Sequence, residues 1–85
     1  MIVKICGMTS SEMAQVVSQS GADWIGFVFA PSRRQISPED AKDIVRRLPA
    51  NLKKVGVFVN ERVERMIEIA DHVGLDMIQL HGDET

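Results

Sequence analysis

The feature that most constrains the fold of this sequence is a regular alternation of short apolar runs with longer amphipathic stretches. Residues 24–29 form the clearest run, which is apolar on both strand faces. Such continuous apolarity is typical of a strand in a parallel sheet covered by helices. Residues 2–6, 55–59 and 76–81 form three similar runs. We therefore predict four strands, with a helical stretch between each consecutive pair.

Helix start and stop signals lie between these runs. Thr9 and Glu12 fit a capping box at the first helix. Ser37 predicts the cap of a second helix, with Pro38 at its first position, and Asn60 predicts the cap of a third. Gly21, Pro49 and Gly74 predict the three helix ends. Helical spacing predicts the following apolar stripes: Met13, Val16 and Val17; Ala41, Ile44, Val45 and Leu48; Val63, Met66, Ile67 and Ala70.

The resulting order β-α-β-α-β-α-β implies parallel strands joined by right-handed crossovers. We expect an α/β fold in which residues 1–85 form a single partial domain, the N-terminal portion, about half, of a (β/α)8 barrel. Residues 21–25 resemble residues 74–78, as repeated βα units would. A complete barrel needs about 200 residues, so the sheet would have two open edges. A compact doubly wound sheet is the alternative, although three helices would then have to cover two faces.

Composition excludes several classes of function. The formal net charge of −2 gives no global attraction to nucleic acid or to an anionic membrane. Cys6 is the only cysteine, which rules out an internal disulfide and fits a reducing cytoplasm. The start of the chain lacks the pattern of a signal peptide, and no apolar run reaches the roughly 18 residues of a membrane span. No glycine-rich phosphate loop, zinc-ligand spacing or nucleophile elbow is present.

Barrel active sites lie at the carboxyl ends of the strands, where four residues are candidates. Cys6 precedes Gly7 and a helix start, a setting that favours a thiolate, although a lone cysteine in a strand can also be apolar filler. Arg33 and Arg34 could grip a carboxylate or phosphate or could simply be solvated. His81 could act as acid, base or donor, or could be a structural histidine.

Three other positions are weaker candidates. Gln79 shares a strand face with His81. His72 is expected to be exposed at the end of the third helix, where it favours the helix dipole. Gly26 and Gly56 lie within strands, where glycine indicates the close approach of a ligand or of a bulky neighbour. Packing is the simpler interpretation of both.

Five sequence blocks, in order, resemble the phosphoribosylanthranilate isomerase family over essentially the whole chain. They are VKICGMT at 3–9, GAD at 21–23 with GFVF at 26–29, SRRQISP at 32–38, VGVFVN at 55–60 and QLHG at 79–82. The resemblance implies a (β/α)8-barrel enzyme of tryptophan biosynthesis. Its reaction is the Amadori rearrangement of N-(5-phosphoribosyl)anthranilate to 1-(2-carboxyphenylamino)-1-deoxyribulose 5-phosphate, an aldose–ketose isomerisation.

The resemblance also implies roles for residues. Cys6 corresponds to the general base, and Arg34 lies close to the anthranilate carboxylate. His81 and Gly7 also belong to the substrate-binding site, where His81 binds or orients the substrate. The general acid is an aspartate on a later strand, beyond Thr85, and the phosphate site is built by late loops. No cofactor or metal is implied. We therefore expect the 85-residue chain alone to be inactive, although the full-length protein is an enzyme.

Two other hypotheses remain. The chain could be a non-catalytic half barrel that self-associates through its open sheet edges to close its sheet. It could also belong to another phosphosugar barrel enzyme, such as an epimerase, since a fold alone does not determine function. Epimerase chemistry gives Cys6 no particular use in its present context. The oligomeric state of the chain distinguishes the self-associating half barrel from the other hypotheses.

Overall fold

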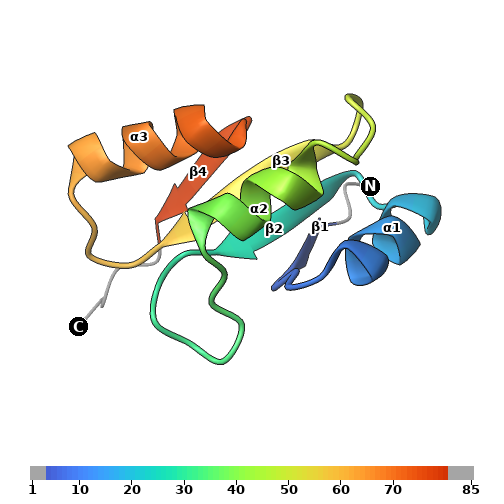
Figure 1. Cartoon of the computed structure of the whole chain (residues 1–85), viewed down its shortest axis with the longest axis horizontal. Coiled ribbons are helices and arrows are strands. Elements are labelled where there is room, and N and C mark those ends of the chain that lie inside the picture. The colour runs from blue at the N-terminus through green and yellow to red at the C-terminus, as the bar shows by residue number, and fades with distance from the viewer. Residues whose placement is uncertain (1–3, 81–85) are drawn as a thin grey trace.

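The structure of this chain, a computed structural model, describes residues 4–80. Its seven elements follow the predicted order (Figure 1). They are β1 (Lys4–Cys6), α1 (Ser11–Gln19), β2 (Trp24–Val28), α2 (Pro38–Val45), β3 (Lys53–Phe58), α3 (Val63–Val73) and β4 (Met77–Leu80). The boundaries of β2 and β3 agree with the predicted ones to within two residues, which is the usual uncertainty at the ends of such elements.

The four strands form one parallel sheet in the order β1-β2-β3-β4. The three helices lie along one side of this sheet (Figure 1). A doubly wound sheet would reverse its strand order and place helices on both faces, so that alternative is wrong. Consecutive parallel strands with every helix on one side are the arrangement of a barrel wall.

The core lies between the sheet and the helices. Ile25, Phe27 and Phe58 contribute fully buried side chains from the strands. Gly56 faces the same layer, and a Cβ built there would lie 2.5 Å from Leu75 Cδ1. Packing therefore explains this glycine, as predicted. On the opposite sheet face, Val55 and Val57 are also buried but lie outside this core cluster.

The helix caps were only partly predicted. Ser37 caps α2, accepting a hydrogen bond from the Asp40 amide at 3.2 Å, with Pro38 in the first turn. The cap of α1 is Ser10 rather than Thr9, because the Ser10 hydroxyl accepts from the Met13 amide at 3.2 Å. Three consecutive hydroxyl residues at 9–11 made this position ambiguous in the sequence.

The prediction that Asn60 caps the third helix was wrong. The N-cap residue of α3 is Arg62, which makes no side-chain capping bond. Asn60 instead has φ +53°, the left-handed conformation that asparagine tolerates better than most residues. It therefore turns the chain away from β3 before the helix begins.

The apolar stripes are wider than the faces that the structure buries. In α1, Ala14 and Val17 are buried, whereas Val16 is 67% exposed. In α3, Met66, Ile69 and Val73 face the core. Four residues of the predicted stripes are exposed: Met13, Val16, Val63 and Ile67. Because helical spacing shows which residues share a side but not how many neighbours cover them, sequence alone overestimated burial.

The predicted repeat is present in the backbone. Gly21 and Gly74 both follow a helix with φ +89°, the left-handed conformation that a helix-ending glycine adopts. In each unit, an aspartate follows two residues after the glycine and directly precedes a strand, β2 after Asp23 and β4 after Asp76. The two units are therefore built alike.

A hydrogen bond across the sheet connects its two edge strands. The Lys4 ammonium of β1 donates to the side-chain carbonyl of Gln79 in β4. A flat four-stranded sheet would hold these strands about 14 Å apart, so the contact indicates a curled sheet. Within residues 4–80, no helix is long and apolar enough to cross a membrane.

Candidate active site

Two loops lie against the carboxyl half of β2, and backbone hydrogen bonds hold both of them there. In the β1–α1 loop, the amides of Gly7 and Met8 donate to the Gly26 carbonyl at 3.0 and 3.2 Å. In the β2–α2 loop, the Ile36 amide donates to the Val28 carbonyl at 2.9 Å. One strand therefore fixes the positions of both loops.

Cys6 is the last residue of β1, where its backbone pairs in register with Gly26. Gly7 follows it and is buried, with φ +88°. The predicted position of Cys6 at a carboxyl strand end is thus confirmed for the backbone. The start of α1 follows only a few residues later, at Ser11.

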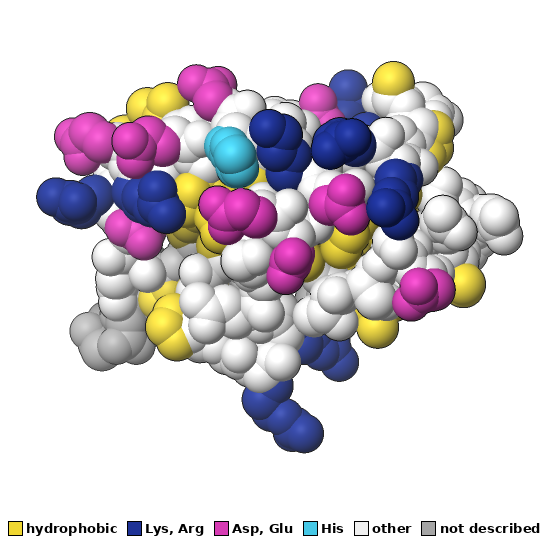
Figure 2. Space-filling model, in the orientation of Figure 1, with side chains coloured by type: hydrophobic (Ala, Val, Ile, Leu, Met, Phe, Trp, Pro, Cys, Tyr) yellow, Lys and Arg dark blue, Asp and Glu magenta, His cyan; other side chains and the backbone are white. Residues whose placement is uncertain are grey.

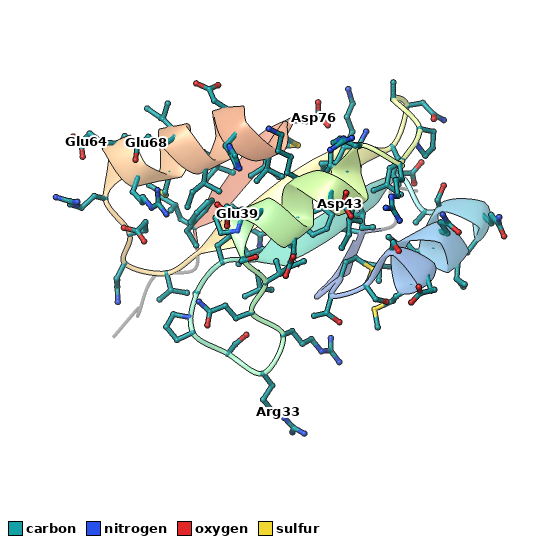
Figure 3. All side chains as sticks on the ribbon, viewed as in Figure 1. Arg33, Glu39, Asp43, Glu64, Glu68 and Asp76 are labelled. Carbon is teal, nitrogen blue, oxygen red and sulfur yellow. The ribbon has the colours of Figure 1, made fainter. Side chains whose placement is uncertain are left out.

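The β2–α2 loop carries both arginines at its exposed tip. Ser32 shapes this tip, since its hydroxyl accepts from the Arg34 amide at 3.1 Å and its carbonyl accepts from the Gln35 amide at 3.2 Å. Arg33 points away from the rest of the chain (Figure 3). Arg34 turns back toward the β1–α1 loop, because a Cβ built on Gly7 would lie 2.5 Å from Arg34 Cδ and 3.0 Å from Nη1.

The structure therefore distinguishes two arginines that the sequence could not separate. Arg34 lies over Gly7, the residue next to Cys6, and Arg33 does not. Both arginines line a hollow of about 360 Å³ between the two loops and α1. Ile5 and Val17, which belong to the layer between the sheet and the helices, also line it.

His81 lies outside the described residues. Gln79, which was expected to share its face, accepts the hydrogen bond from Lys4. Sequence reasoning missed this role of Lys4, because nothing in a linear pattern shows that β1 and β4 approach one another. His72 is exposed in the last turn of α3, as expected.

Other surface features of the described residues give weaker indications of a functional site. A groove of about 400 Å³ lies between the β2–α2 loop and α3, with Arg65 and Glu61 on its walls. Acidic and basic side chains are intermixed over the helices, so no surface of one sign forms there (Figure 2). No group of three metal-ligating side chains occurs among the residues that the structure describes.

Comparison with known proteins identifies the family. The family described as N-(5'-phosphoribosyl)anthranilate (PRA) isomerase matches residues 3–85. The N-(5'-phosphoribosyl)anthranilate isomerase of Bacillus cereus strain B4264 is 57% identical over 84 residues, which are 99% of this chain and 41% of that protein. This chain thus spans about two fifths of the length of the curated relatives it matches.

Solved structures agree. Phosphoribosyl anthranilate isomerase from Thermotoga maritima is 52% identical, with a TM-score of 0.95 over 100% of this chain and 42% of that one. A phosphoribosyl anthranilate isomerase in complex with reduced 1-(o-carboxyphenylamino)-1-deoxyribulose 5-phosphate has the same identity and TM-score, and 45% of it is covered. The parallel sheet is thus about half of a (β/α)8 barrel, and the chain belongs to the phosphoribosylanthranilate isomerase family.

Proposed function

We propose that this chain contributes the first half of a phosphoribosylanthranilate isomerase of tryptophan biosynthesis, acting in the cytoplasm. Family membership over residues 3–85 is the observation that carries the proposal. The placement of Cys6, Gly7 and Arg34 around one strand end supports it. The substrate is N-(5-phosphoribosyl)anthranilate. The reaction is an aldose–ketose isomerisation that needs no metal or cofactor.

The reaction begins with ring opening. A general acid, supplied by a later strand of the full-length protein, donates a proton to the ring oxygen of the ribose. The C1′–O bond breaks, and the electron pair of the anilino nitrogen forms a C=N bond. The protonated Schiff base that results is a strong electron sink for the next step.

Cys6 is the general base of that next step. Its thiolate removes the C2′ proton, the C–H electron pair forms a C1′=C2′ bond, and the nitrogen becomes neutral. The enolamine then tautomerises to the ketone product. Arg34 binds the anthranilate carboxylate with its planar guanidinium, Gly7 lies beside it, and His81 orients the substrate.

Growth without tryptophan tests the proposal. We define the chimera as the Bacillus cereus isomerase in which this chain replaces the matching segment, which is 57% identical over 84 residues. The chimera should restore growth to a bacterial strain that lacks the isomerase. An empty vector and the 85-residue chain alone should not. Failure of a folded, well-expressed chimera would overturn the assignment.

A second candidate is the self-associating half barrel, which one observation favours. Ile78 and Leu80 of the edge strand β4 are 40% and 63% exposed, and Val63 and Ile67 of α3 are exposed as well. A single partial domain with these apolar surfaces would pair with another copy. Sedimentation of the 85-residue chain would show a dimer in that case and a monomer otherwise.

A further inference from the structure

We propose that Gly7 is a positioning residue whose missing side chain lets Arg34 lie across the loop that follows Cys6. The geometry is direct. A Cβ at Gly7 would lie 2.5 Å from Arg34 Cδ, 3.0 Å from Nη1 and 3.4 Å from Nε. A separation of 2.5 Å is well below carbon–carbon contact distance, which is about 3.5–4.0 Å. Any side chain at position 7 must therefore displace the arginine.

The backbone on both sides of this contact is fixed. The Gly7 amide donates to the Gly26 carbonyl, and the Ile36 amide donates to the Val28 carbonyl. Both acceptors belong to β2, which pairs with strands on either side. Arg34 is exposed and its side chain has several rotatable bonds. The side chain of Arg34, rather than either loop, is therefore the part that yields.

This inference rests on the proposed function, because a displaced Arg34 affects catalysis only if it binds the substrate carboxylate. That contact exists in both the ground state and the transition state. Its loss should therefore raise KM and leave kcat nearly unchanged. A defect in the base at Cys6 would lower kcat instead.

The chain offers a matched control for the backbone cost of a substitution. Gly7 has φ +88°, so alanine there is strained wherever its Cβ points. Gly21 has φ +89°, and nothing lies within 4 Å of its Cβ position. Gly21→Ala therefore carries a similar strain without the contact, and it lies outside the candidate active site.

The experiment compares Gly7→Ala, Gly21→Ala, Arg34→Ala and the double variant Gly7→Ala/Arg34→Ala in the chimera. We expect Gly7→Ala to raise KM about 10- to 100-fold, the range for a lost charged hydrogen bond. Gly21→Ala should leave KM unchanged. Arg34→Ala should raise KM by at least as much as Gly7→Ala, and Gly7→Ala should then add no further increase.

An NMR measurement decides the inference independently of activity. The Arg34 Nε–H resonance, assigned by its loss in Arg34→Lys, should shift in Gly7→Ala and stay in place in Gly21→Ala. An unchanged resonance in Gly7→Ala would overturn the inference. A KM increase that persists on the Arg34→Ala background would also overturn it. If the unmodified chimera neither binds nor turns over the substrate, the proposed function is wrong. The resonance shift would even then show whether Gly7→Ala displaces Arg34.

Discussion

The two ends of the sheet use their polar residues in opposite ways, and Asp76 and Arg33 lie far apart on the molecule (Figure 3). At the amino end, Lys54 is only 6% exposed, and its ammonium donates to the Pro49 carbonyl at 2.8 Å. Asp76 pairs with the Lys54 backbone twice, since its carboxylate accepts from the Lys54 amide at 2.9 Å and its own amide donates to the Lys54 carbonyl at 2.8 Å. Polar groups at this end satisfy one another.

At the carboxyl end, the charged groups are exposed. Arg33 and Arg34 extend from the β2–α2 loop, and backbone bonds to β2 hold the neighbouring loops in place. One sheet therefore has a stabilising end and a candidate binding end. Hydrogen bonds between polar groups stabilise the sheet at the amino end, while we propose that an arginine at the carboxyl end binds a ligand, as expected where barrel active sites lie. Substitutions at the two ends should therefore affect different measurements.

The largest expected effect concerns the carboxyl end as a whole. The 85-residue chain alone should show no isomerase turnover above background, because the resemblance assigns the general acid and the phosphate site to later strands. The chimera should turn over the substrate at a rate within the ordinary range of about 1–10³ per second. A steady-state assay of both at equal concentration makes the comparison. Substantial turnover by the chain alone would show that residues 1–85 contain a complete site.

The next effect concerns the amino end. Asp76→Ala removes a carboxylate that accepts from a strand amide, so the chimera should lose about 1–3 kcal/mol of unfolding free energy. Its kcat and KM should not change while it is folded. Asp43→Ala is the matched control, because Asp43 makes only an exposed ion pair with Arg47 at 3.4 Å and should cost less than about 0.5 kcal/mol. Urea denaturation measures the unfolding free energy of both variants. Equal losses would show that the hydrogen bonds of Asp76 stabilise the sheet no more than an exposed ion pair does.

The smallest effect distinguishes two neighbouring hydroxyls near the carboxyl end. Ser10→Ala removes the capping bond of α1 and should cost about 1 kcal/mol. Thr9→Ala should cost less than about 0.5 kcal/mol, because Thr9 is exposed and precedes the cap. The same denaturation assay compares them. If Thr9→Ala lost more unfolding free energy than Ser10→Ala, Thr9 would be the cap, as the capping box in the sequence predicted.

Much of the fold could be predicted because local signals and global order agree. Continuous apolarity at 24–29, the Ser37–Pro38 helix start and the glycine stops at Gly21 and Gly74 all appear in the structure as expected. The cap of α1 and the cap of α3 could not be predicted, since several polar residues in a row fit either helix start. The extent of burial on α1 and α3 also depends on neighbours that a helical pattern does not specify.

The candidate site could likewise be predicted only in part. Strand order places Cys6 and the arginine loop at one end of the sheet, and this much follows from the sequence. The difference between Arg33 and Arg34, and the passage of Arg34 over Gly7, depend on distances between loops 27 residues apart in the chain. The roles of Cys6 and His81 came from resemblance to the family rather than from physical pattern.

The most direct test of the central claim is the kcat of Cys6→Ala in the chimera, measured with Cys6→Ser and the unmodified chimera in the same assay. If Cys6 is the general base, kcat should fall about 10²- to 10⁴-fold in Cys6→Ala, while the urea midpoint stays near that of the unmodified chimera. A Cys6→Ala variant that keeps near-normal kcat would contradict the account, because the carboxyl end of β1 would then hold no base.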